Sequence, residues 1–137
     1  LYNILQFPSL KFSKNDSFSK KESAQINEIA IKSSSGSISN INICREDNTL
    51  HIVKLAKKSG LTIISCSEKS ETKISDINLK KPILFIFGSE KNGISQNLIK
   101  LSDNIAKIPI CGQTDSLNVS VASGITLYEY VRQNNSN

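Results

Sequence analysis

Residues 83–87 form a run of five consecutive apolar side chains, Ile-Leu-Phe-Ile-Phe, that ends abruptly at Gly88. A short run without polar alternation predicts a strand covered on both faces, as in a parallel sheet. A second apolar run at 61–66 is rich in β-branched residues, and a third at 105–110 is interrupted by Pro109. These runs predict a buried sheet that must be covered by helices above and below.

The segments between these runs carry helical patterns. Apolar spacing predicts helices over residues 22–34, 95–101 and 119–131, and another that Asn48 caps and that ends before Gly60. Short strands are expected at 1–7 and 41–44. The alternation of strands and helices predicts an α/β fold with a mostly parallel sheet and helices on both faces. A length of 137 residues suits a single domain over 1–137.

Composition excludes several classes of protein. No apolar run approaches the roughly 18 residues that span a bilayer, and the amino terminus shows no secretory signal. The cysteines Cys44, Cys66 and Cys111 are far apart, and His51 is the one histidine, so no metal site or disulfide framework is expected. We therefore expect a cytoplasmic protein without a membrane partner. The net charge of +5 fits a nucleic-acid partner but also many other proteins.

The loop after the 83–87 run is the first candidate site. Ligands of open α/β sheets bind beyond the carboxyl ends of the strands. Gly88 and Gly93 would let the backbone approach a ligand closely, and Glu90 between them could act as an acid, a base or a hydrogen-bond acceptor. A plain strand-to-helix turn with a solvated Glu90 is the alternative. A phosphate-binding loop needs Lys and then Ser or Thr after its second glycine; Ser95 fits the last position, but Ile94 stands in place of the Lys, so nucleotide triphosphate chemistry is disfavoured.

The second candidate site is the segment 108–118. Pro109 removes a ladder donor, which leaves nearby backbone groups for something other than a neighbouring strand. Ser116 or Asn118 could cap the final helix. A capped helix without further function is the alternative reading of this segment.

Three blocks of sequence together resemble one family. They are F-G-S-E-K-N-G-I at 87–94, I-P-I at 108–110 and S-L-N-V-S-V-A-S-G-I-T-L-Y-E at 116–129. In order, spacing and residue type they are similar to the carboxy-terminal signature of the SpoU family, the TrmH-like members of the SPOUT RNA methyltransferases. A weaker similarity extends through 32–36 back to about Asn15.

The resemblance implies a fold, a cofactor and a substrate. The fold would be an α/β domain with a carboxy-terminal trefoil knot, a rare exception to the rules of chain threading. The cofactor would be S-adenosylmethionine, and the acceptor a ribose 2′-hydroxyl of RNA, with rRNA favoured over tRNA. Family members pair through the knot region, so a homodimer is expected. By position, the resemblance assigns cofactor binding to Gly88, Ile108 and Leu117.

The resemblance also assigns the polar positions of the active site, which are Glu90, Ser116 and Asn118. Active members carry an amino-terminal N-x-G-x-x-x-R motif whose arginine is thought to assist deprotonation of the hydroxyl. The arginines here are Arg45 and Arg132, in unrelated contexts, and the motif segment is missing between about residues 6 and 12. A knotted RNA-binding module with impaired catalysis is therefore the main alternative. A flavodoxin-like nucleotide binder is disfavoured because the loops lack a phosphate cradle.

Overall fold

The structure is a computed structural model that describes residues 3–7, 32, 35, 48–89, 92–112 and 116–135. The chain divides into two compact units, residues 1–10 with 50–137 and residues 11–49. The helix predicted over 22–34 and the strand predicted at 41–44 lie outside the described residues of the second unit. The first unit contains the sheet and the described residues of both candidate sites.

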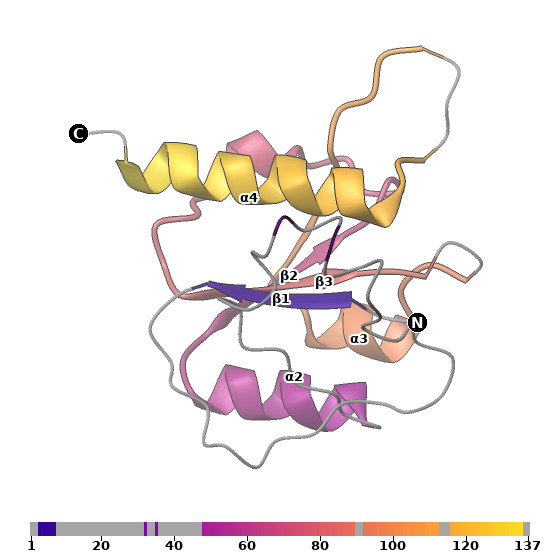
Figure 1. Cartoon of the computed structure of the whole chain (residues 1–137). Coiled ribbons are helices and arrows are strands. Elements are labelled where there is room, and N and C mark those ends of the chain that lie inside the picture. Colours follow the sequence, from indigo (N-terminus) through magenta and orange to yellow (C-terminus); the bar gives the residue numbers. More distant parts are fainter. Residues whose placement is uncertain are drawn as a thin grey trace. The chain divides into compact units, whose positions relative to one another are not determined.

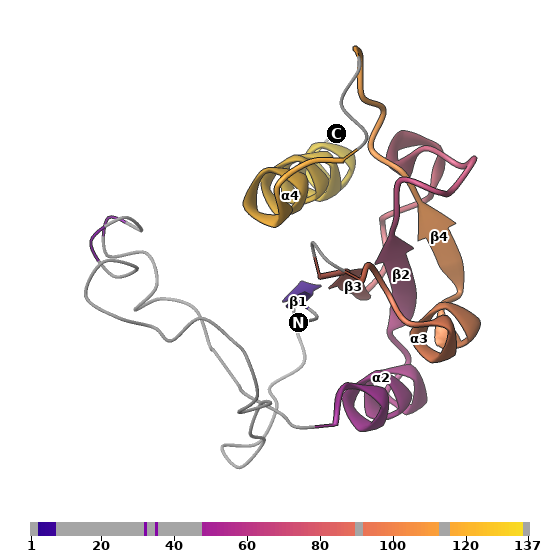
Figure 2. The ribbon, with the colours of Figure 1, turned by 90° about the vertical axis from the view of Figure 1, so that its right-hand side faces the viewer.

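The first unit is built on a four-stranded sheet in the order β1-β3-β2-β4 (Figure 2). β3 (Ile83–Phe87) is the run of five apolar residues, and all five are buried. It pairs in parallel with β2 (Thr62–Cys66) and antiparallel with β1 (Asn3–Phe7). β4 (Asn104–Ala106) pairs in parallel with the outer edge of β2. The prediction of a mostly parallel sheet is therefore confirmed.

Helices cover both faces of the sheet (Figures 1 and 2). α2 (Thr49–Lys58) and α3 (Gln96–Leu101) lie on one face, and α4 (Val119–Asn135) lies on the other. Side chains of a strand alternate between faces. Leu84 and Ile86 of β3 therefore pack with α2 and α3, while Phe85 packs with Tyr130 of α4. The predicted α/β class is confirmed.

β4 is shorter than the strand predicted at 105–110. Its ladder on β2 ends at Ala106, and Lys107 makes one further bridge, to Lys73. The chain then leaves the sheet two residues before Pro109. A proline has no N–H to donate and suits a segment that has left the ladder.

The segment between β2 and β3 contributes more to the core than its polar sequence suggests. It contains a short 3-10 helix, η2 (Ile74–Asp76), and its three apolar residues Ile74, Ile77 and Leu79 are all buried. They belong to the same apolar cluster as Phe85 and Tyr130, on the α4 face of the sheet. α4 itself continues to Asn135, four residues beyond the predicted end, because its last turn binds this segment through polar contacts.

A charged contact joins the end of α2 to the segment between α3 and β4. Lys57 Nζ lies 2.7 Å from Asp103 Oδ1, and the Ile63 N–H donates to Asp103 Oδ2 at 2.9 Å. Burial raises the pKa of the Asp103 carboxyl, but the hydrogen bonds from Ile63 and Lys57 outweigh this effect, and the pKa is lowered overall.

Gly60 follows α2 with a φ of +85°, as predicted for the end of a helix. None of the described helices is long and apolar enough to cross a membrane.

Candidate functional site

A cavity of about 400 Å³ lies beyond the carboxyl ends of the three parallel strands. This volume is within the range of small-molecule sites, about 300–1,000 Å³. Four segments line the cavity: the turn after β2, the turn after β3, the segment after β4, and the start of α4. Their described lining residues are Cys66, Ser67, Glu68, Lys69, Phe87, Gly88, Ser89, Asn92, Gly93, Ile94, Ile108, Ile110, Ser116, Leu117, Val119 and Ala122.

The three predicted cofactor-binding residues, Gly88, Ile108 and Leu117, all line this cavity. Ser116, predicted for the active site, lines it as well. Residues up to 29 positions apart in sequence are thus brought to one place, as the family resemblance implies. Glu90 lies outside the described residues, so its predicted role stays a prediction.

The turn after β3 is closed by its own backbone. The Ser89 N–H donates to Gly93 O at 3.2 Å, and the Gly93 N–H donates back to Ser89 O at 2.9 Å. A Cβ atom on Gly88 would lie 2.4 Å from the Gly93 carbonyl carbon and 2.8 Å from the Ile94 nitrogen. Close approach of a ligand was the predicted reason for a glycine at position 88. The structure gives a different reason, since the backbone of the same turn fills that space.

The segment after β4 has backbone groups that no other described residue uses. Ile108 and Ile110 line the cavity, and no hydrogen bond among the described residues uses the backbone of either one or of Pro109. Leu117 on the facing segment likewise makes no backbone hydrogen bond within the described chain. Polar backbone groups need partners from solvent or from a ligand. The cavity therefore combines apolar side chains with backbone donors and acceptors that the rest of the described chain does not use, a combination that suits an adenosine-type ligand.

Asn118 is placed at the start of α4 and does not line the cavity. Its Oδ1 accepts a hydrogen bond from the Ser120 N–H at 2.9 Å, and its carbonyl accepts one from the Ala122 N–H at 2.9 Å. This is the geometry of a helix N-cap. The structure therefore supports the capping role named for Asn118, and it gives its predicted catalytic role no direct contact with the cavity.

The turn after β2 is the part of the site that sequence reasoning missed. Ser67, Glu68 and Lys69 line the cavity, although no glycine or family motif marks them. A usable signal was present, because the run at 61–66 was predicted as a strand. The carboxyl ends of parallel strands meet at one edge of a sheet, so the residues after both runs could have been expected together.

Cys66 forms part of the cavity wall at the end of β2. Burial raises the pKa of its thiol to about 12, partly offset by its contact with Thr126 Oγ1 at 4.0 Å. The thiol is therefore protonated at neutral pH and is a poor nucleophile.

His51 is exposed on α2, and Cys111 is an exposed free cysteine. In the part of the chain that the structure describes, no three potential metal ligands come together.

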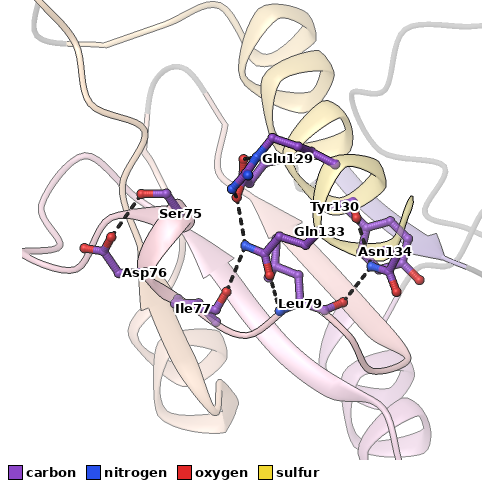
Figure 3. Close-up of polar contacts among 9 residues, drawn as sticks. Ser75, Asp76, Ile77, Leu79, Glu129, Tyr130, Gln133 and Asn134 are labelled. Atoms are coloured by element: carbon purple, nitrogen blue, oxygen red, sulfur yellow. Dashed lines mark hydrogen bonds and ion pairs between the residues drawn. The ribbon is translucent and has the colours of Figure 1, made fainter. Parts of the chain in front are cut away.

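The far end of α4 is fastened to the segment after η2 by a polar network (Figure 3). Gln133 Nε2 donates to Ile77 O at 3.2 Å, and Gln133 Oε1 accepts from the Leu79 N–H at 2.9 Å. Asn134 Nδ2 donates to Leu79 O at 3.0 Å. The buried carboxylate of Glu129 accepts from Gln133 at 2.8 Å and from Arg132 at 2.7 and 2.8 Å. Because the other end of α4 lines the cavity, this network fixes the helix that supplies one cavity wall.

Glu129 makes this network sensitive to acid. The hydrogen bonds from Arg132, and then from Gln133, lower the pKa of Glu129 below its ordinary value of 4.5, against the opposing effect of burial. A carboxylate with a lowered folded pKa stabilises the protein above its unfolded pKa, and this stability is lost as pH falls through the folded value. We expect Glu129→Gln to lower the free energy of unfolding by about 2 kcal/mol at pH 6.

Urea unfolding between pH 6 and pH 3 measures this effect. The difference between the two proteins is expected to shrink as pH falls below about 4.5, because protonated Glu129 resembles glutamine. The control is Glu71→Gln, which removes a weak surface pair with Lys107 and should match the wild-type protein at every pH. Parallel stability curves for the wild-type protein and Glu129→Gln would contradict this role of Glu129.

These features define a class of protein: an α/β domain with a small-molecule pocket beyond the ends of its parallel strands. The profile of the SpoU rRNA Methylase family matches residues 12–128, which is most of the chain. The chain belongs to the SpoU rRNA methylase family. A protein of Archaeoglobus fulgidus, described as an uncharacterised tRNA/rRNA methyltransferase, is 36% identical over 114 residues. This match covers 83% of the present chain and 50% of that protein. The chain spans half or less of the length of the first curated relatives it matches.

Solved structures of related proteins agree with the fold. The SpoU methyltransferase AviRb from Streptomyces viridochromogenes, in complex with the cofactor AdoMet, superposes with a TM-score of 0.74 at 26% identity. That superposition covers 83% of the present chain and 47% of AviRb. An RNA 2′-O ribose methyltransferase superposes with a TM-score of 0.69 at 27% identity, over 75% of the present chain and 40% of that enzyme. The SPOUT class of α/β fold predicted from the sequence is thereby confirmed.

Proposed function

We propose that this chain is an S-adenosylmethionine-dependent RNA methyltransferase that transfers a methyl group to a ribose 2′-hydroxyl. The observation that carries the proposal is the convergence of Gly88, Ile108 and Leu117 on one cavity. The AdoMet complex of AviRb supports the choice of cofactor, and the related 2′-O ribose methyltransferase supports the acceptor. The family description favours rRNA, while the name of the Archaeoglobus relative includes tRNA as well.

The residues present suit the proposed cofactor. Ile108, Ile110 and Leu117 offer apolar surface to the nucleoside, and their backbone groups, which no other described residue uses, can satisfy its polar edge. When bound, S-adenosylmethionine supplies an activated methyl group, so positioning contributes much of the rate. We assign Ser116 to orienting the acceptor ribose or the cofactor, and Asn118 to ordering the loop that carries Ser116. Glu90 is assigned to the active site by resemblance.

Deprotonation of the 2′-hydroxyl needs a base or a nearby cation. Arg132 of the same chain does not fill this role, because its guanidinium donates two hydrogen bonds to the Glu129 carboxylate on α4. Arg45 lies outside the described residues. The lack of the arginine motif between about residues 6 and 12 favours the second candidate function, a knotted RNA-binding module with impaired catalysis.

We further propose a homodimer formed through α4. Four large apolar side chains of this helix are exposed, and they follow one another at intervals of four, three and three residues, as neighbours on a helix surface do. An exposed apolar stripe of this kind is typical of an interaction surface. The residues are Val121, Ile125, Tyr128 and Val131.

We also propose that residues 1–137 form one SPOUT domain with a carboxy-terminal trefoil knot. We propose that this domain acts in the cytoplasm.

Methyl transfer is tested with tritiated S-adenosylmethionine on undermethylated rRNA and tRNA. We expect label in rRNA that survives alkali as a resistant dinucleotide, because a 2′-O-methyl group blocks cleavage of the adjacent phosphodiester. Asn118→Ala should reduce incorporation at least about tenfold and stability by about 1 kcal/mol through loss of the helix cap.

The assay separates the two candidate functions. Calorimetric binding of S-adenosylmethionine without label transfer to either RNA would favour the impaired binding module. Absence of cofactor binding by a well-folded sample would overturn both the cofactor and the enzyme proposals. Label in tRNA alone would retain the enzyme and reverse the preferred substrate.

A further inference from the structure

The turn after β2 places two opposite charges at the cavity. Glu68 and Lys69 both line it and are both exposed. Neither side chain makes a hydrogen bond or an ion pair within the described residues, and the two do not pair with each other. Two adjacent residues at the edge of the pocket thus carry a carboxylate and an ammonium group that no described residue pairs.

The backbone of this turn is held firmly against β4. The Ser67 N–H donates to Ala106 O at 2.8 Å, and Ser70 Oγ donates to Ile105 O at 2.7 Å. Within the turn, the Ser70 N–H donates to Ser67 O at 3.2 Å. Glu68 and Lys69 lie between these two anchor points. The sheet therefore sets where the backbone of both residues lies relative to the cavity, which reduces the cost of ordering the turn on binding.

The other described polar side chains of the cavity are neutral. They are the hydroxyls of Ser67, Ser89 and Ser116 and the amide of Asn92. Charge recognition by the described residues therefore falls to Glu68 and Lys69. A nucleoside carries no charge at neutral pH, whereas an α-amino acid carries an ammonium and a carboxylate a few bonds apart. The pair of free charges matches that end of an amino-acid-bearing nucleoside.

We propose that Glu68 and Lys69 bind the amino-acid end of the methyl donor. Glu68 accepts hydrogen bonds from the α-ammonium group, and Lys69 donates to the α-carboxylate. The apolar wall formed by Ile108, Ile110 and Leu117 is left to the nucleoside. This inference rests on the proposed function, and it assigns each end of the ligand to a different part of the cavity.

Two probes separate the two ends of the ligand. S-adenosylhomocysteine carries the amino-acid end, and 5′-methylthioadenosine shares its nucleoside and thioether but lacks that end. Calorimetry should show that Glu68→Gln and Lys69→Met each weaken S-adenosylhomocysteine binding about fivefold, the scale of an exposed ion pair. Binding of 5′-methylthioadenosine should not change. Added salt should weaken the first ligand more than the second.

Glu71→Gln and Lys73→Met are matched controls, since they remove the same charges from the same segment without touching the cavity. Both should bind S-adenosylhomocysteine as the wild-type protein does. Equal weakening of both ligands by Glu68→Gln or Lys69→Met would overturn the assignment, and so would unchanged binding of both. A wild-type protein that binds neither ligand would refute the proposed function itself.

Discussion

Gly88→Ala is expected to abolish most cofactor binding, with an affinity for S-adenosylmethionine reduced at least about a hundredfold. The new Cβ would lie 2.4 Å from the Gly93 carbonyl carbon, 2.7 Å from its Cα and 2.8 Å from the Ile94 nitrogen. All three atoms belong to backbone, so no side-chain rotation relieves the contact. The turn between β3 and α3 must open, which displaces Ser89, Asn92 and Gly93 from the cavity wall.

Calorimetry measures the affinity, and urea unfolding measures the accompanying loss of stability, expected at about 1–3 kcal/mol. Gly124→Ala is the control, because a Cβ at this helical glycine meets nothing within 4 Å. That variant should keep its affinity and gain up to about 1 kcal/mol from helix propensity. An unchanged affinity in Gly88→Ala would show that the turn can open without disturbing the site.

The parts of the fold that depend on local pattern were predictable. The run at β3 predicts its own burial, and the spacing in 119–131 predicts α4. The parts that depend on distant partners were not. Ile74, Ile77 and Leu79 stand too far apart to form an apolar run, and α4 supplies the surface that buries them. Gln133 extends α4 for the same reason, since its partners lie at Ile77 and Leu79.

The candidate site shows the same division. Gly88, Ile108, Ser116 and Leu117 were found because the family signature joins segments that local physics treats separately. Glu68 and Lys69 carry no such signature, and only the register of β2 beside β3 brings their turn to the cavity. Asn118 was assigned two roles, capping and catalysis. Its hydrogen bonds explain the capping role, because a cap depends on the first turn of its own helix.

Phe85→Ala should have the largest effect on stability, lowering the free energy of unfolding by about 3–5 kcal/mol. Phe85 is fully buried at the centre of β3. Its ring meets Tyr130 of α4 edge to face, with centroids 6.5 Å apart and an interplanar angle of 87°. Removing the ring leaves a cavity and also loses this aromatic contact. A domain of this size has about 5–15 kcal/mol in total, so a large part of its stability would be lost.

Urea unfolding followed by circular dichroism measures the loss, and Phe85→Leu is the control. Leucine retains most of the apolar volume and should cost less than Phe85→Ala, although it also loses the contact with Tyr130. Because α4 lines the cavity through Val119 and Ala122, loosening its contact with β3 should also weaken S-adenosylhomocysteine binding. A loss below about 1 kcal/mol in Phe85→Ala would mean that α4 does not depend on this ring. The stability of the cavity wall would then rest on Glu129, Gln133 and Asn134 at the other end of the helix.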